Sequence, residues 1–328
     1  MRRANRPHPT FGEVVQENKW PRIAVMGAGA VGCYFGGMLA RAGAPVTMIG
    51  RSAHVEAMTR NGLFLDSIHF QQQIKISAST EVDAVRGAEI VLLCVKTLET
   101  EEAAKALTPH LASDIVVVSL QNGVDNVERI RNTAKIDAIP AVVYVAAEMI
   151  APGRVKHTGR GDLIIGSHSE HNQREDHRRH VLENLSALFT RAEVPCRTSE
   201  NINGDLWIKL IINCAYNAIS ALSRARYGLV VRNPWTHELM RKVVEEALAV
   251  ANAAGVRMPD IDLLAATWKL AEAMPNATSS TAQDIARGKR TEIDSLNGYI
   301  ARRGAELGIA TPVNQTLHAL VKLIEEAA

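Results

Sequence analysis

The segment that most constrains this chain is GAGAVG, which follows the short apolar run RIAVM and precedes CYFGGMLARAG. Its glycines, Gly27, Gly29 and Gly32, have GxGxxG spacing between a predicted strand and a predicted helix. In this context, near the start of a βαβ unit, the spacing is typical of a turn that binds a dinucleotide. Taken alone, the same spacing also fits a tight strand–helix turn that binds nothing.

Each residue of such a turn has its own role. Gly27 permits the turn, Gly29 lets a pyrophosphate approach the backbone, and Gly32 lets the helix and the strand pack closely. Ala30 and Val31 open the helix, whose first N–H groups and positive dipole end favour phosphate groups. We therefore predict that Gly27, Gly29, Ala30, Val31 and Gly32 bind the cofactor.

The end of the next strand bears on which dinucleotide binds. The predicted strand at 45–50 is followed by Arg51, and no acidic residue comes before Glu56. NAD sites usually place an Asp or Glu here, whereas an arginine can pair with the 2′-phosphate of NADP. The pattern favours NADPH, although a solvated arginine after a strand would look the same.

Two later strands end in polar residues. Lys96 follows the apolar run IVLLCV, and Asn122 follows DIVVVSLQ. Because open parallel sheets bind ligands at the carboxyl ends of their strands, both side chains are candidate ligand contacts. Asn122 equally fits a turn residue that precedes Gly123.

Strand and helix patterns alternate up to about Pro195, after which strand signals stop and helical periodicity takes over. The sequence predicts an α/β domain of the Rossmann type, with a parallel sheet covered on both faces, followed by an all-α domain. VKHTG and DLIIGS are expected to form an antiparallel edge. The predicted domains are a flexible extension at 1–20, a dinucleotide-binding domain at 21–198 and a helical substrate and catalytic domain at 199–328.

Composition excludes several other classes of protein. Lys and Arg total 37 against 35 Asp and Glu, so no excess charge draws the 328-residue chain to nucleic acid or to an anionic membrane. Its uncharged apolar stretches are shorter than the roughly 18 residues of a transmembrane helix. Four scattered cysteines without a CxxC pair, and a first segment without an apolar core, favour reduced thiols in the cytoplasm.

Histidines at metal-like spacing occur in SHSEHNQREDHRRH, as His168-x-x-His171 and His177-x-x-His180. No cysteine or further ligand set accompanies them within this polar run. We read the segment as a solvated loop before a helix and predict no metal site.

The segment LWIKLIINCAYNAISAL carries the most informative polar pattern. Lys209, Asn213, Asn217 and Ser220 share one helical face, while apolar residues cover most of the remainder. A solvated face usually shows several long charged side chains, whereas this one shows a single lysine beside amides. The stripe suits the wall of a cleft that orients a small polar ligand, and it equally suits an amphipathic helix with a thin wet face.

A second polar cluster contains Ser280 and Glu292. On one continuous helix these residues would lie about 18 Å apart, too far to touch one small substrate. Gly288-Lys289-Arg290 offers a break, after which Thr291 could cap a new helix with Glu292 in its first turn. Glu292 also fits a glutamate that the dipole favours at a helix start.

With these motifs in their order and spacing, the chain resembles ketopantoate reductases from Arg22 to its C-terminus. The resemblance rests on the segments GAGAVG, CVKT, SLQNGVDN, APGRVKHTGRG, KLIINCAYNAISAL, SSTAQDIARGKRTEIDSLNG and ELGIATPVN. It implies an NADP-dependent oxidoreductase that acts on CH–OH groups and converts 2-dehydropantoate to (R)-pantoate on the route to pantothenate. It also implies a Rossmann domain and a helical domain with the active site between them.

The resemblance assigns roles to individual residues. It identifies Lys209 as the catalytic lysine, a general acid, and Glu292 as the acid that pairs with it or with a substrate hydroxyl. The residues expected to orient the 2-oxo acid substrate are Asn122, Asn213, Asn217 and Ser280. Those expected to contact NADPH include Arg51, Lys96 and Asn122.

Two alternatives to this function stay open. Tyr227-Gly228 departs from members of the family that carry an asparagine before the glycine, so a different 2-oxo acid on the same scaffold is one alternative. A protein that senses NADP(H) without turnover is the other, although it has no need of the lysine–amide stripe. The apolar helix faces of the second half leave a homodimer open.

Overall fold

The computed structural model describes residues 19–167 and 175–327. Within these residues the chain divides into two compact units. Unit 1 runs to Gln121 and from Asp125 to Ile202, and unit 2 comprises Asn122–Val124 and the chain from Asn203 onward. Residues 1–18 of the predicted extension lie outside the described residues. Trp20, which the prediction places in that extension, packs under the Arg191 guanidinium in unit 1.

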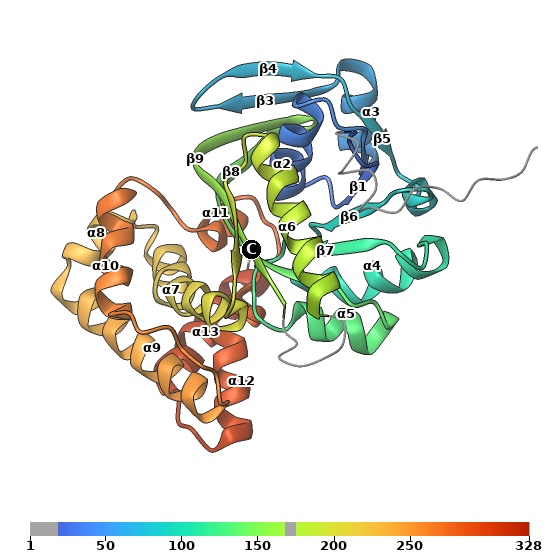
Figure 1. Cartoon of the computed structure of the whole chain (residues 1–328). Helices are drawn as coiled ribbons and strands as arrows, with labels where there is room; N and C mark the ends of the chain where they lie inside the picture. Colours follow the sequence, from blue (N-terminus) through green and yellow to red (C-terminus); the bar gives the residue numbers. More distant parts are fainter. Residues whose placement is uncertain (1–18, 168–174, 328) are drawn as a thin grey trace, which may run out of the picture. The chain divides into compact units, whose positions relative to one another are not determined.

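The described part of unit 1 contains a ten-stranded sheet (Figure 1). Its strands are β1 (Ile23–Met26), β2 (Val46–Ile49), β3 (Leu63–Ser67), β4 (Gln71–Ile74), β5 (Ser77–Ser79), β6 (Ile90–Leu93), β7 (Val116–Ser119), β8 (Ile139–Ala151), β9 (Arg154–Gly166) and β10 (Cys196–Ser199). Their order is β4-β3-β9-β8-β7-β6-β1-β2-β5, and β10 pairs with β9. All neighbours are parallel except β3 with β4 and β8 with β9.

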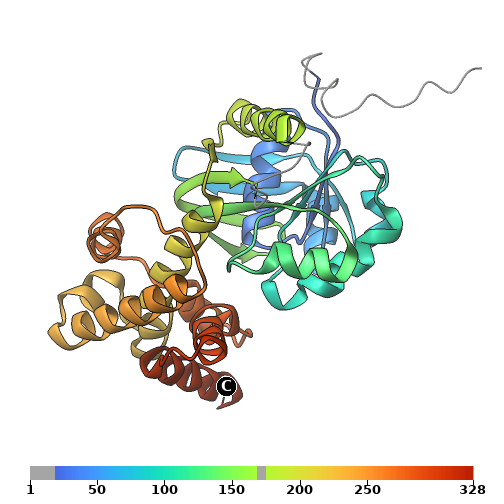
Figure 2. The same cartoon turned by 60° about the horizontal axis from the view of Figure 1, so that its bottom comes forward.

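Helices cover both faces of this sheet. They are α2 (Ala30–Arg41), α3 (Ser52–Asn61), α4 (Thr100–Leu107), α5 (Asn126–Ala134) and α6 (Glu175–Arg191), with the short 3-10 helices η1 (Val82–Val85), η2 (Thr97–Glu99) and η3 (Thr108–His110). Figure 2 shows α6 on one side of the sheet and α4 and α5 on the other. The prediction of a sheet covered on both faces is confirmed, and the sheet is mixed rather than wholly parallel.

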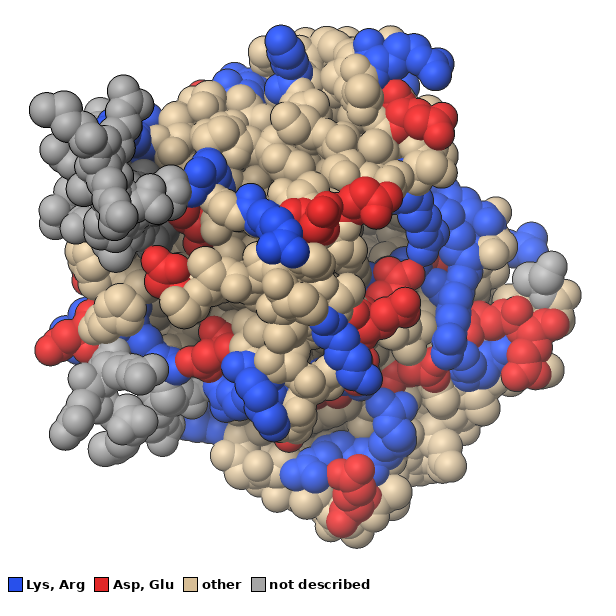
Figure 3. All heavy atoms as spheres, turned by 90° about the vertical axis from the view of Figure 1, so that its right-hand side faces the viewer, with Lys and Arg blue, Asp and Glu red and all other residues tan. Residues whose placement is uncertain are grey.

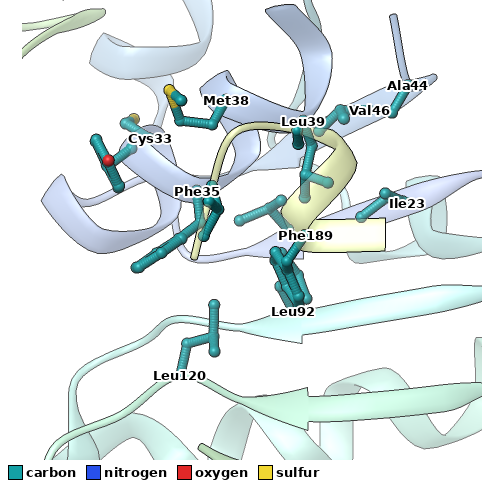
Figure 4. Packing of buried hydrophobic residues seen from close by; sticks show 14 of the residues in the cluster. Ile23, Cys33, Phe35, Met38, Leu39, Ala44, Val46, Leu92, Leu120 and Phe189 are labelled. Atoms are coloured by element: carbon teal, nitrogen blue, oxygen red, sulfur yellow. The ribbon is translucent and has the colours of Figure 1, made fainter. Parts of the chain in front are cut away.

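Successive side chains of one strand enter opposite cores, which explains the unbroken apolar runs. Ile23 of β1 packs with α2 and α6 in one cluster, and Ala24 packs with α4 and α5 in the other. Figure 4 shows the first cluster, in which the rings of Phe35 and Phe189 meet edge to face at 6.5 Å. Because both rings are fully buried, each contributes about 1.5–3 kcal/mol through burial.

Two predictions about strands are wrong in part. VKHTG and DLIIGS belong to one strand, β9, which is antiparallel to β8 as expected but lies inside the sheet, because β3 pairs along its other side. Strand signals also continue past Pro195, since β10 lies parallel to β9. The first error arises because β3 and β9 are far apart in the sequence, so no local pattern shows that they pair. The second arises because β10 (CRTS) is short and largely polar, so no apolar pattern marks it.

Unit 2 is helical in its described part. Its elements are α7 (Ile202–Ser223), α8 (Tyr227–Arg232), α9 (Pro234–Ala253), α10 (Leu263–Ala273), α11 (Ser280–Ala286), η4 (Ile293–Ser295), α12 (Asn297–Leu307) and α13 (Pro312–Ala327). Buried residues of α7, α9, α10, α12 and α13 form one core. By length and composition α7 is the one described helix that could cross a membrane, yet 67% of its apolar window is buried, as in the core helix of a folded domain.

Charged side chains of both signs are mixed on the surface. Figure 3 shows Lys and Arg interspersed with Asp and Glu over the face that it draws. This mixture agrees with the small formal net charge of +2.

Candidate active site

The glycine turn, Gly27–Gly32, connects β1 to α2 and is fixed by steric limits. Gly27 has φ 112°, and a Cβ on it would lie 2.7 Å from the Cys94 carbonyl carbon. A Cβ on Gly32 would lie 2.1 Å from the Gly27 carbonyl oxygen. At both positions only glycine avoids a severe clash.

The middle of the glycine turn, unlike its two ends, has free space beside the backbone. Gly29 is exposed at the N-cap of α2, and a Cβ on it would meet nothing within 4 Å. Ala30 and Val31 begin the helix, and its first turn contains no acidic side chain. A helix N-terminus with free space before it and no carboxylate beside it fits the pyrophosphate of a dinucleotide.

Arg51 and Lys96 lie at the same edge of the sheet as this turn. They follow β2 and β6, which flank β1 as parallel neighbours. The Arg51 side chain is 83% exposed, and its Nη2 lies 2.9 Å from Glu99 Oε1 in η2. The sequence did not reveal this acid, because it lies 48 residues further along the chain. Since an exposed ion pair contributes little, Arg51 can exchange Glu99 for a ligand phosphate.

The polar stripe predicted on LWIKLIINCAYNAISAL lies on α7. Lys209 and Asn213 are half-buried, whereas Asn217 and Ser220 are buried. The rest of the helix packs into the core of unit 2 through residues that include Leu210, Ile211, Cys214 and Ala215. The stripe is therefore not an ordinary solvated face.

Asn122 joins Lys209 to Glu292 through its side-chain amide. Lys209 Nζ donates to Asn122 Oδ1 at 2.8 Å, and Asn122 Nδ2 donates to Glu292 Oε2 at 3.0 Å. All three residues belong to unit 2, because Asn122–Val124 clusters with the helices. We call this arrangement the Asn122 bridge. It connects three of the predicted site residues.

The same amide contact fixes which way Asn122 points. An ionised carboxylate accepts hydrogen bonds and cannot donate them, so Glu292 requires the NH2 group of Asn122. The amide oxygen of Asn122 then faces the Lys209 ammonium, which only donates. Glu292 thereby orients Lys209 through Asn122.

Asn217 meets the start of α11. Its Nδ2 donates to Ser280 Oγ at 3.4 Å, and its carbonyl accepts from Ser279 Oγ at 3.1 Å. Ser279 is buried and caps α11 by accepting from Ala282 N, whereas Ser280 is exposed. Sequence reasoning singled out Ser280 and missed Ser279, although a serine before a helix is a recognisable N-cap signal.

Glu292 is held from the C-terminal helix. As predicted, the helix does not continue through Gly288: α11 ends before it, and Gly288 has φ 59°. Thr291 Oγ1 accepts from Ile293 N at the start of η4, and the Thr291 N–H donates to Glu325 Oε1 of α13 at 2.7 Å. Glu292 thus precedes a single 3-10 turn rather than standing in the first turn of a helix.

Two further sequence features have a clear structural setting. Tyr227 begins α8, and its backbone N–H donates to the Ala277 carbonyl. The centroids of the Tyr227 and Tyr216 rings lie 4.4 Å apart, and burial raises the pKa of the Tyr227 hydroxyl to about 12.

His177 and His180 lie on α6, while His168 and His171 are outside the described residues. Within residues 19–167 and 175–327, no group of three or more His, Cys, Asp or Glu is arranged to hold a metal ion.

Comparisons with known proteins cover nearly the whole chain. The family model for ketopantoate reductase PanE/ApbA matches residues 23–170, and the model for its C-terminal region matches residues 201–325. A 2-dehydropantoate 2-reductase from Pyrococcus abyssi is 33% identical over 303 residues, which span 92% of this chain and 97% of that protein.

Solved structures give the same picture. A PanE/ApbA family ketopantoate reductase from Ralstonia eutropha JMP134 is 51% identical, covers 93% of this chain and 99% of its own, and has a TM-score of 0.86. A 2-dehydropantoate 2-reductase from Geobacter metallireducens GS-15 is 28% identical, covers 94% of this chain and 100% of its own, and has a TM-score of 0.84. The chain therefore belongs to the ketopantoate reductase family.

Proposed function

We propose that this protein is a 2-dehydropantoate 2-reductase, an NADP-dependent oxidoreductase that acts on CH–OH groups. It reduces the C2 ketone of 2-dehydropantoate to the alcohol of (R)-pantoate in pantothenate biosynthesis. The observation that carries the proposal is the Asn122 bridge, because it places an oriented ammonium beside polar side chains in a chain whose relatives bear this name.

The proposed roles follow from what a ketone requires. NADPH, when bound, supplies a hydride to C2, and negative charge develops on the ketone oxygen. Lys209 stabilises that charge and transfers a proton from Nζ to the oxygen, which completes the alcohol. Asn122 and Glu292 hold the direction of the Lys209 ammonium.

The remaining polar residues orient the substrate. Asn213, Asn217 and Ser280 would hold the carboxylate and the distal hydroxyl of the 2-oxo acid. The side chain of Asn213 forms no hydrogen bond with the residues that the structure describes, so its amide group can bind a ligand.

A nicotinamide cofactor fits the glycine turn through Gly27, Gly29, Ala30, Val31 and Gly32. The preference for NADPH over NADH is assigned to Arg51, with its 2′-phosphate contact, and to Lys96 and Asn122 as further cofactor contacts. Glu99 beside Arg51 sets a limit on that preference, because a carboxylate can accept from an unphosphorylated ribose.

The two parts of the chain have separate roles in this function. Residues 21–198 bind the dinucleotide and 199–328 provide the helical substrate domain, to which Asn122–Val124 is added. The partner is a small 2-oxo acid rather than nucleic acid or a membrane. All four cysteines are unpaired, which supports a cytoplasmic location.

The test measures the oxidation of NADPH, through the loss of its absorbance, in the presence of 2-dehydropantoate or of one of a panel of other 2-oxo acids. We expect fast turnover of 2-dehydropantoate, weaker turnover with NADH, and a kcat for Lys209→Ala that is about 10²- to 10⁴-fold lower. Turnover of another oxo acid alone would change the substrate, and Tyr227 is the first position to examine. Binding of NADPH without turnover of any substrate would favour a sensor.

A further inference from the structure

The segment that carries Asn122 is held at both of its ends. Asn122–Val124 packs with unit 2, while Gln121 and Asp125 on either side belong to unit 1. Gly123 in the middle has φ 99°, a conformation that suits glycine. Because the chain is continuous, the backbone direction of this segment depends on how the residues on either side of it are held.

Gln121 fixes the first end. It is buried, and its Oε1 accepts from Ser119 Oγ at 2.8 Å. Its Nε2 donates both to Val95 O at 3.1 Å and to Thr100 Oγ1 at 2.7 Å. Since a primary amide has two donor hydrogens, both are used, and the residue directly before Asn122 cannot turn without breaking a buried hydrogen bond.

Thr100 connects this end to the other. It is the first residue of α4 and fully buried, and its hydroxyl donates to Asn126 Oδ1 at 3.1 Å. A hydroxyl has one donor hydrogen and two acceptor lone pairs. The Thr100 hydroxyl therefore accepts from Gln121 and donates to Asn126, which begins α5 and is itself buried.

We infer that Thr100 is a positioning residue for Asn122, and this inference rests on the proposed function. One oxygen atom joins Gln121 and Asn126 and so clamps both ends of the segment between them. Asn122 in turn holds the Lys209 ammonium, so the Thr100 hydroxyl acts on proton transfer through the Asn122 bridge without touching the substrate.

The inference is tested by replacing Thr100 while its shape is kept. Thr100→Val removes the hydroxyl and leaves Gln121 Nε2 and Asn126 Oδ1 each short of one buried partner. Thr100→Ser keeps the hydroxyl. Thr108→Val is the matched control, since Thr108 directly follows α4 and, among the described residues, its hydroxyl donates only to the backbone carbonyl of Ala104 in the preceding turn.

Kinetics give the first readout. For Thr100→Val we expect kcat with 2-dehydropantoate to fall about tenfold, and the Kd of NADPH to change by less than about threefold. Thr100→Ser should restore kcat to within about threefold of wild type, and Thr108→Val should leave it unchanged. A Thr100→Val enzyme with wild-type kcat, or loss in Thr108→Val equal to that in Thr100→Val, would overturn the inference.

A double variant shows whether Thr100 acts through Asn122. In an Asn122→Ala background, Thr100→Val should change kcat by less than about twofold, because the side chain that it positions is already gone. A general loss of structure would instead multiply the two effects. If Thr100→Val lowered kcat by the same factor in the wild-type and the Asn122→Ala backgrounds, the inference would therefore be contradicted.

Hydrogen exchange decides the question even if the wild type turns over no substrate, an outcome that would refute the proposed function alone. Backbone amides of residues 121–126 should exchange about tenfold faster in Thr100→Val than in wild type or Thr108→Val. Unchanged exchange in this segment would show that Thr100 does not hold it.

Discussion

The glycine turn of unit 1 and the Asn122 bridge of unit 2 are built in opposite ways. The turn uses six consecutive residues and presents backbone N–H groups, so steric limits on glycine decide its shape. The bridge joins side chains that are 87 and 170 residues apart, and hydrogen-bond direction decides its shape. A change at Gly27 or Gly32 should therefore damage the fold and cofactor binding together, whereas a change in the bridge should damage chemistry in a folded protein.

The largest effect is expected from Gly32→Ala. The added Cβ would lie 2.1 Å from the Gly27 carbonyl oxygen, so β1 and α2 must move apart. We expect the free energy of unfolding to fall by about 3 kcal/mol and NADPH binding to be lost. Urea unfolding and a fluorescence titration with NADPH measure the two effects.

Gly29→Ala is the matched control for that change. A Cβ at position 29 meets no atom within 4 Å, so the variant should fold with wild-type stability. It should still bind NADPH about tenfold more weakly, because the methyl group enters the space that the pyrophosphate needs. Equal stability losses in the two variants would show that the turn is not governed by local sterics.

Glu292→Gln tests the bridge. A neutral amide oxygen accepts the hydrogen bond from Asn122 Nδ2 more weakly than a carboxylate does, so Asn122 and the Lys209 ammonium that it accepts from are held less firmly. We expect kcat to fall about 10²-fold with little change in thermal stability. Glu326→Gln, an exposed acid on α13, should leave kcat unchanged. A large loss of stability in Glu292→Gln would remove the contrast with the turn.

The same contrast explains how much the sequence predicted. The glycine turn was predictable in full, because strand, turn and helix are consecutive and glycine has few other reasons to recur at that spacing. The α7 stripe was predictable because helical periodicity places Lys209, Asn213 and Asn217 on one face. Both predictions depend only on neighbours in the sequence.

Contacts between segments that are far apart in the sequence could not be predicted from local patterns. Nothing near Asn122 indicates that its amide lies between Lys209 and Glu292, and nothing near Arg51 indicates that Glu99 lies beside it. Each contact results from strand order and helix packing. The resemblance to a family identified the residues of the bridge, whereas only the structure shows that Asn122 is hydrogen-bonded to both Lys209 and Glu292.

Arg51→Ala sharpens the comparison at the cofactor end of unit 1, where a side chain rather than backbone is proposed to read the ligand. Loss of a charge-assisted hydrogen bond to the 2′-phosphate should lower the NADPH-over-NADH ratio of kcat/KM about tenfold, with unchanged stability. Arg60→Ala, a change of an exposed arginine on α3, the helix that follows Arg51, is the control. A ratio that stays at the wild-type value would assign the preference to another residue.

Glu325→Gln should have the smallest effect, and its sign depends on pH. Burial alone would raise the pKa of Glu325, but hydrogen bonds from Lys322 and Thr291 outweigh burial and lower this pKa below its ordinary value of 4.5. A lowered pKa means that the ionised group stabilises the fold above pH 4.5 and that this stability is lost as pH falls through the folded-state pKa. Glu325→Gln should therefore cost about 1 kcal/mol at neutral pH.

The difference in unfolding free energy between wild type and Glu325→Gln should shrink as the pH is lowered below 4.5, because the wild-type carboxyl becomes neutral as well. Urea unfolding at a series of pH values measures it. Asp294, whose pKa is also lowered because hydrogen bonds from His318 and Lys322 outweigh its burial, keeps some acid sensitivity in the variant. A difference that grows on acidification would mean that Glu325 does not hold Thr291 as a carboxylate.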